Sequence, residues 1–69
     1  RFMLAPWCYR SENRGVYHDF YANYRDLSHL YALFDAFDNG FTVNDAVING
    51  IDEVEILRLY RDGYLVPLR

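Results

Sequence analysis

Residues 41–68 read FTVNDAVINGIDEVEILRLYRDGYLVPL, and they contain two capped apolar patterns that each repeat at helical spacing. Thr42 can cap the first helix, with Asp45 at the third position making a shortened capping box. Asp52 can cap the second helix, where Glu55 completes a capping box. The sequence therefore predicts two short helices, with inner faces formed by Val43, Ala46 and Val47 in the first and by Val54, Ile56, Leu57 and Tyr60 in the second.

Two glycines set the ends of these helices. Gly50 stops the first helix and Gly63 the second, because glycine takes the left-handed conformation that closes a helix without strain. We expect Gly50→Val to destabilise the protein more than Gly63→Val. A side chain at residue 50 would push the two helices apart, whereas residue 63 lies beside the surface. Residues 64–66 then read as a strand that Pro67 closes.

The preceding segment also has apolar and aromatic residues at helical spacing, and no Gly or Pro interrupts it between Val16 and Asn39. Asp19 can cap its start, and Asn39-Gly40 can end it with a left-handed turn. The pattern predicts one long helix over Asp19–Asp38, or two nearly continuous helices. The stripe expected in its core consists of Phe20, Tyr24, Leu27, Tyr31 and Phe34.

The first eighteen residues have a different pattern. Pro6 lies within an apolar and aromatic run, and proline cannot donate a ladder hydrogen bond, so an edge strand or an extended arm fits better than a central strand. The stretch SENRG, residues 11–15, contains serine, asparagine and glycine, which favour turns. Residues 7–10 and 16–18 are therefore expected to pair as a short hairpin across that turn.

A longer helix followed by two short helices, joined by a turn that contains glycine, is the order of a tri-helical helix-turn-helix. Ala46 keeps the first short helix thin, and Gly50 and Ile51 follow in the order that lets the two helices cross closely. With the tail LRLYRDGYLVPLR, residues 28–69 resemble the winged-helix superfamily at the level of the fold.

This resemblance implies a mainly α fold, with a tri-helical helix-turn-helix core and a minimal β-sheet made from the two chain ends. We expect one domain over residues 1–69, because a chain of 69 residues buries only a modest core. Residues 1–18 would form the extended arm or hairpin. Residues 19–69 would form the helical core with its C-terminal strand.

Charge is distributed unevenly and argues against a DNA-reading helix. The net charge is −3, yet residues 1–25 carry four arginines against two acids, and residues 26–69 carry three arginines against eight. Asp52, Glu53 and Glu55 stand where a recognition helix would meet phosphates, and carboxylates there oppose binding. The alternative function, a DNA-binding transcription regulator of helix-turn-helix type, would have to use Arg10, Arg14 and Arg25.

The preferred function is that of a small non-enzymatic adaptor or regulator that binds another protein or itself. Seven of the thirteen aromatic residues lie in the basic part of the chain, and tyrosine and arginine are enriched at protein interfaces. The candidate contact residues are Tyr9, Arg10, Arg14, Tyr17 and Tyr21.

Other kinds of chemistry find little support. Cys8 is the only cysteine, so no intrachain disulfide can form, and a cytoplasmic or other reducing intracellular compartment is expected. A nucleophile made from Cys8, His18 and Asp19 is a weak candidate, because so short a chain leaves little room for a pocket. His18 and His29 lack metal-ligand spacing, and DAFDNG at residues 35–40 lacks calcium ligands. We expect no cofactor, no metal and no membrane span.

Overall fold

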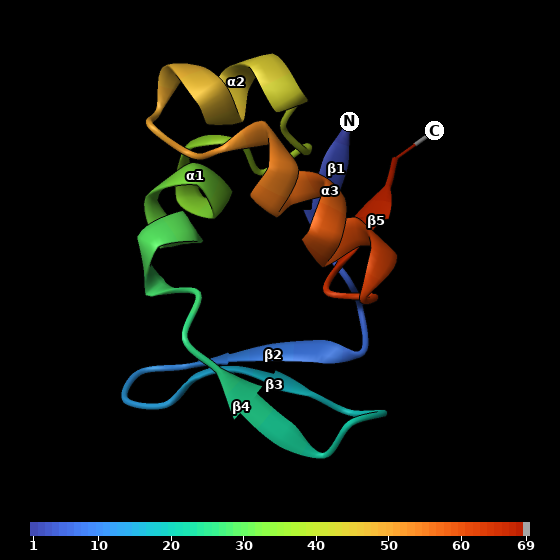
Figure 1. Cartoon of the computed structure of the whole chain (residues 1–69). Helices are drawn as coiled ribbons and strands as arrows, with labels where there is room; N and C mark the ends of the chain where they lie inside the picture. Colours follow the sequence, from blue (N-terminus) through green and yellow to red (C-terminus); the bar gives the residue numbers. More distant parts are fainter. Residues whose placement is uncertain (69) are drawn as a thin grey trace.

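Two small antiparallel sheets and a set of short helices make up residues 1–68, the part of the chain that the computed structural model describes (Figure 1). The first sheet pairs β1 (Phe2–Leu4) with β5 (Leu65–Pro67), and the second contains β2 (Cys8–Ser11), β3 (Gly15–His18) and β4 (Asn23–Arg25). The helical elements are the 3₁₀ turn η1 (Ser28–Leu30), α1 (Tyr31–Ala36), α2 (Val43–Ile48) and α3 (Glu53–Arg61).

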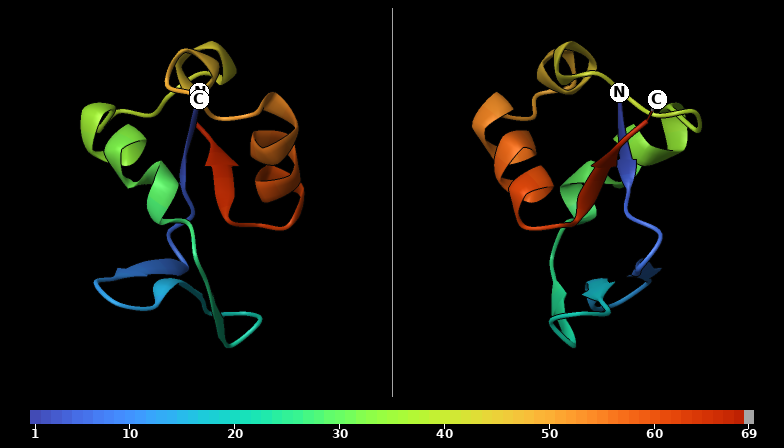
Figure 2. Two further views of the ribbon diagram at one scale, coloured as in Figure 1. Left: turned by 60° about the vertical axis from the view of Figure 1, so that its left-hand side comes forward. Right: turned by 90° about the vertical axis from the view of Figure 1, so that its right-hand side faces the viewer.

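The two chain ends lie side by side. Met3 is opposite Val66 in the antiparallel pair of β1 and β5, and both views of Figure 2 show the two strands next to each other. On its other side, β1 makes a bridge at Phe2, whose N–H donates to the carbonyl of Phe41 at 2.7 Å. The first view of Figure 2 places this strand pair between α1 and α3, so the chain ends lie among the helices.

The three-stranded sheet is a meander in the order β2-β3-β4 that lies below the helices in Figure 1. The turn between β2 and β3 is closed by Ser11, whose hydroxyl accepts from the N–H of Arg14 at 2.9 Å. The turn between β3 and β4 contains Ala22 at a φ of 54°, a left-handed conformation that residues with a Cβ rarely adopt. The hairpin expected near residues 7–18 is therefore present, and a third strand extends it.

The long helix predicted over Asp19–Asp38 is wrong. Residues 19–22 form a turn, Asn23–Arg25 form β4 against β3, and helical structure begins only at Ser28. Tyrosine and phenylalanine also favour strands. Hydrogen bonding to β3 stabilises a strand here, although the apolar residues of this segment recur at helical spacing. Asp26 lies just before the helical part, and its carboxylate accepts from both the N–H and the hydroxyl of Ser28 at 3.0 and 2.7 Å.

The mainly α fold and the resemblance to helix-turn-helix and winged-helix domains are consequently also wrong. The protein is a mixed α/β domain with two antiparallel sheets. A tri-helical core needs a long first helix, whereas α1 has six residues and the segment before it belongs to the meander. The pairing of α2 with α3 across Gly50 does not amount to that fold.

The capping residues behave largely as the sequence predicts. Thr42 and Asp45 form a reciprocal capping box at the start of α2, and the Asp52 carboxylate accepts from the N–H of Val54 at 2.9 Å at the start of α3. Glu55 does not complete a second box. Its carboxylate lies 2.6 Å from Nε2 of His29, which ties α3 to η1.

One core joins the meander, the helices and the terminal strands. Its fully buried side chains include Val16 of β3, Leu30 of η1, Ile56 and Leu59 of α3, and Leu65 of β5. The inner face predicted for α3 is therefore mostly wrong, since only Ile56 of that set is buried. The predicted core residues that are instead exposed are Phe20, Tyr24, Val47, Val54, Leu57 and Tyr60.

Candidate functional site

Three tyrosines form a row across the meander, one on each strand. Tyr9 of β2 is directly opposite Tyr17 of β3, which is in turn opposite Tyr24 of β4. Successive side chains of a strand point to opposite faces, and the flanking residues Val16 and His18 are buried. Tyr9 and Tyr24 are exposed and Tyr17 is half-buried between them. The three rings therefore lie on the sheet face that turns away from the core.

The row is ordered by contacts between its own members. The rings of Tyr17 and Tyr24 meet edge to face with centroids 5.1 Å apart, which is a favoured geometry for aromatic pairs. The guanidinium of Arg14 lies 5.5 Å from the centroid of Tyr24, within the range of a cation–π contact. We call Tyr9, Tyr17, Tyr24 and Arg14 the tyrosine face.

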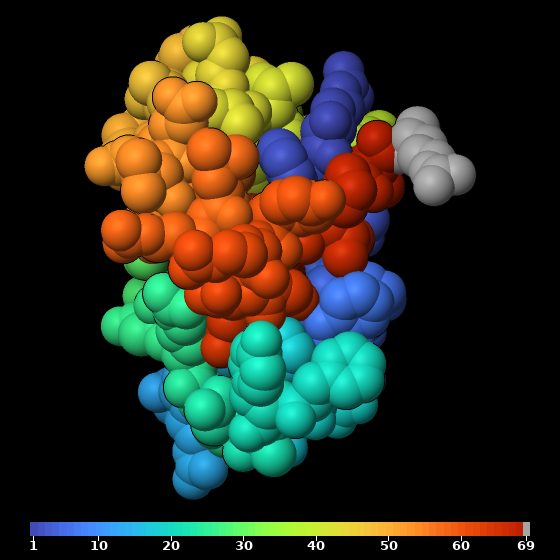
Figure 3. Space-filling view, turned by 45° about the vertical axis from the view of Figure 1, so that its right-hand side comes forward, coloured from blue at the N-terminus to red at the C-terminus, as the bar shows by residue number. Residues whose placement is uncertain are grey.

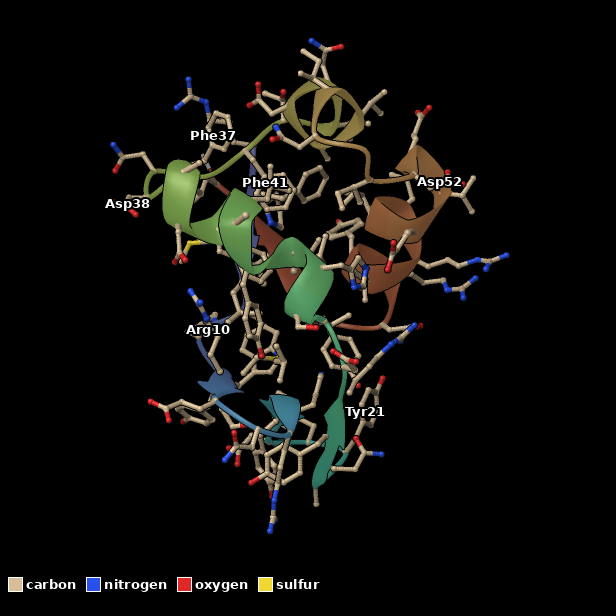
Figure 4. The ribbon with its side chains drawn as sticks, turned by 90° about the vertical axis from the view of Figure 1, so that its left-hand side faces the viewer. Arg10, Tyr21, Phe37, Asp38, Phe41 and Asp52 are labelled. Atoms are coloured by element: carbon tan, nitrogen blue, oxygen red, sulfur yellow. The ribbon has the colours of Figure 1, made fainter. Side chains whose placement is uncertain are left out.

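Arg10 and Arg25 lie on the opposite side of the sheet. Arg10 donates to Asp35 of α1 at 2.7 Å and sits 4.3 Å over the ring of Tyr31. Figure 4 shows Arg10 directed from β2 toward the helices. Arg25 lies 3.7 Å from Asp62, at the end of α3. Both arginines thus connect the meander to the helices, and the structure does not join them with Arg14 in one cationic surface.

Tyr21 lies in the turn between β3 and β4, where it stacks on His18 with ring centroids 4.1 Å apart (Figure 4). Next to it, the ring of Phe20 is 73% exposed and packs against Trp7 with ring centroids 5.5 Å apart. Tyr21 also meets the buried Tyr64, with ring centroids 6.3 Å apart, so this turn packs toward the core side of the sheet. Of the predicted contact residues, Tyr9, Arg14 and Tyr17 share the tyrosine face, whereas Tyr21 and Arg10 do not belong to it.

Tyr24 is the member of the site that sequence reasoning missed. Its spacing from Leu27 and Tyr31 placed it in the core of a helix that does not form. An indication was available in the composition of residues 15–25, where aromatic and β-branched residues outnumber strong helix formers. The turn at Ala22 carries no glycine, however, so the second hairpin has no sequence signature.

The residues Cys8, His18 and Asp19 are close together but are not arranged as a nucleophile. The Nδ1 atom of His18 accepts from the N–H groups of Phe20 and Tyr21 at 3.2 and 3.4 Å, so this nitrogen is not available to the thiol. Burial, with a smaller contribution from the Asp19 charge, raises the pKa of Cys8 to about 11. A thiol with this pKa is almost entirely protonated at neutral pH and is a poor nucleophile.

A shallow cleft lies on another side of the protein, between β1 and the end of α1. Its volume is about 220 Å³, which is smaller than most small-molecule sites. Phe37, Asp38 and Phe41, which are labelled in Figure 4, are among the residues that line it. Of the charged groups at the cleft, Arg10 and Asp35 pair with each other, and Asp38 makes no ion pair within the described residues 1–68. The cleft therefore offers a mainly apolar lining with one unpaired carboxylate.

Within residues 1–68, His, Cys, Asp and Glu side chains do not gather in groups of three or more that would hold a metal ion. None of the helices in the same described range is long and apolar enough to cross a membrane.

Comparisons with known proteins add no relative to these observations: no protein-family model, no curated protein and no solved structure matches this chain.

Proposed function

We propose that this protein is a small binding module that uses its tyrosine face to contact another protein. The observation that carries the proposal is the register of Tyr9, Tyr17 and Tyr24, which aligns three rings on the outer face of one sheet. The other face of the same strands contributes Val16 and His18 to the core. The tyrosine rings are thus held in place by a packed sheet while they stay accessible to a partner.

Tyrosine is well suited to such a surface. It offers a large ring with few rotatable bonds, so little conformational entropy is lost on binding, and its hydroxyl can donate or accept. Tyr17 stands at the centre of the row, and central aromatic residues tend to carry most of the binding energy. We therefore expect Tyr17 to matter most.

The charge next to the row favours an acidic partner. Arg14 has no ion pair with the other residues in the described range 1–68, and its guanidinium lies over Tyr24. A carboxylate of a partner protein would find a cation there that is not already neutralised. Arg10 and Arg25 are engaged with Asp35 and Asp62 on the other side of the sheet.

The alternative of DNA binding has less support. It was tied to a helix-turn-helix, which this protein lacks, and the start of α3 carries Asp52, Glu53 and Glu55. With two of its four arginines paired, the basic part offers few free cations for phosphates. We also keep a reducing intracellular compartment as a prediction, on the ground that Cys8 is a free thiol.

The experiment uses site-specific photo-crosslinking of the full chain in its native cell extract, followed by mass spectrometry. A photoreactive phenylalanine analogue replaces Tyr17 in one protein and Ile48, which is 74% exposed on α2, in a matched control. We expect peptides of one partner protein to attach at residue 17 but not at residue 48. Tyr17→Ala and Arg14→Glu should then weaken binding of that purified partner at least tenfold. Failure of residue 17 to capture any protein, or unchanged affinity in both variants, would refute the proposal.

A further inference from the structure

The outer face of α3 exposes an apolar stripe, at one end of which the ring of Tyr60 packs against Phe2 of β1 with ring centroids 5.5 Å apart. Val54, Leu57 and Tyr60 are 52%, 47% and 47% exposed, whereas Ile56 and Leu59 on the other side of the helix are fully buried. Figure 3 shows α3 lying across the middle of one face of the molecule, with α2 above it and the turn between β3 and β4 below it. Val54, Leu57 and the exposed part of Tyr60 are thus open to a partner.

Charged residues of opposite sign stand at the two ends of this stripe. Glu53 lies in the first turn of α3 and Arg61 in its last turn, and both are exposed. At 3.6 residues per turn, Glu53, Arg61 and the three apolar residues fall within an arc of about 120° on the helix surface. The face therefore has an acidic end, an apolar middle and a basic end.

This order is self-complementary when two copies of the helix run antiparallel. Leu57 lies at the centre, because Val54 and Tyr60 are each three residues away from it and Glu53 and Arg61 are each four residues away. A two-fold axis at Leu57 would place Val54 against Tyr60 of the second copy. It would also place each Glu53 beside Arg61 of the other copy. We propose that the outer face of α3 binds a second copy of this chain as an antiparallel, two-fold symmetric helix pair.

The charges on this face are available for such a pairing. The only ion pair of Arg61 within residues 1–68 is with the adjacent Asp62 at 3.5 Å, and the Arg61 side chain is 74% exposed. Exposed pairs of this kind contribute little to stability, so Arg61 can turn to a new carboxylate at small cost. Glu53 takes part in no ion pair of the described residues.

The helix is short, so the dimer should be weak. Nine residues of helix span about 14 Å, and the area covered lies at or below the lower end of specific interfaces. We expect a dissociation constant in the high micromolar range that rises with ionic strength, since the Glu53 and Arg61 charges remain near solvent. The meander is a separate part of the surface, so this inference does not depend on the proposed function.

Sedimentation equilibrium of the purified full chain at low salt, at concentrations up to about 1 mM, tests the proposal. Glu53→Arg and Arg61→Glu should each raise the dissociation constant at least tenfold, because each places like charges together. The double variant Glu53→Arg/Arg61→Glu restores opposite charges and should return it to within about threefold of the parent value. Leu57→Asp places two carboxylates at the two-fold axis. This variant should sediment as a monomer, and its circular dichroism spectrum should show that it is folded.

Three results would overturn this inference: a monomer over the whole concentration range, dimerisation that neither single charge swap weakens, or single-swap losses that the double variant does not reverse. Tyr17→Ala serves as the matched control on the other surface and should leave the dimer unchanged. If Tyr17→Ala abolishes self-association, the tyrosine face is itself the dimer interface, and the assignment to α3 is wrong.

Discussion

Substituting the two helix-closing glycines should give the opposite order to the one the sequence predicts. Gly50 and Gly63 have φ values of +83° and +84°, so a residue with a Cβ is strained equally at either position. Their surroundings differ. An added Cβ at Gly50 meets nothing within 4 Å, whereas one at Gly63 lies 3.2 Å from Nε2 of His18 and 3.9 Å from Nε1 of Trp7. The earlier expectation that Gly50 is the more crowded site is therefore wrong.

The expected losses follow from these contacts. The left-handed backbone costs a residue with a Cβ about 1–2 kcal/mol at either site. At Gly63 a valine side chain must also displace His18, which is 2% exposed and packed against Tyr64, and such overpacking costs about 1–3 kcal/mol more. We expect Gly50→Val to lose about 1–2 kcal/mol and Gly63→Val about 2–5 kcal/mol. A chain of 69 residues has a total stability of roughly 3–10 kcal/mol, so the second variant should be close to unfolding.

Urea unfolding followed by circular dichroism measures both losses. Gly63→Val combined with His18→Ala completes a double-mutant cycle with the two single variants and the parent. If His18 is the obstacle, the loss caused by valine at residue 63 should be smaller when residue 18 is alanine. Equal losses for Gly50→Val and Gly63→Val, or no coupling between residues 63 and 18, would refute the reasoning.

Three further predictions concern ionisable and capping groups. The hydrogen bond from Arg10 lowers the pKa of Asp35. The pair therefore stabilises the folded protein above the ordinary aspartate pKa, and this stability is lost as the pH falls through the lowered pKa. Asp35→Asn should reduce the loss of stability at acidic pH when urea midpoints are measured as a function of pH. Because the pKa of Cys8 is raised to about 11, iodoacetamide should alkylate the folded protein at pH 8 about 100-fold more slowly than the urea-unfolded protein, and equal rates would contradict the burial of the thiol. Asp52→Ala should cost about 1 kcal/mol in urea unfolding, and Thr42→Ala about the same, since each removes one cap hydrogen bond from a helix; a loss near zero would show that the cap contributes nothing.

Local signals in the sequence are predictive where the physical cause is also local. The caps at Thr42 and Asp52 depend only on a side chain and the backbone two or three residues later, and both are present. The first hairpin was predictable for the same reason, because the turn at residues 11–15 contains serine, asparagine and glycine. The signals that indicate these elements are therefore local, although the elements pack into the shared core.

The segment from Asp19 to Arg25 could not be assigned in this way. Its aromatic residues satisfy both a helical spacing and strand propensity, and the choice is made by β3, which pairs with it. The connecting turn uses Ala22 in a left-handed conformation, which sequence patterns do not indicate. The partner β3 is the neighbouring strand in the chain, but a strand whose turn carries no sequence signal cannot be recognised from its own residues. The fold class was predicted wrongly for this reason.

The same limit applies to the face of α3 that packs inward. Val54, Leu57 and Tyr60 form one apolar stripe, and Ile56 and Leu59 form another, so period alone does not say which stripe is buried. The choice depends on the sheets against which the helix packs. A chain of 69 residues with 52% hydrophobic residues has more apolar side chains than its small interior can hold. Side chains left over on one continuous face, as on the meander and on α3, are therefore the positions where we expect partners to bind.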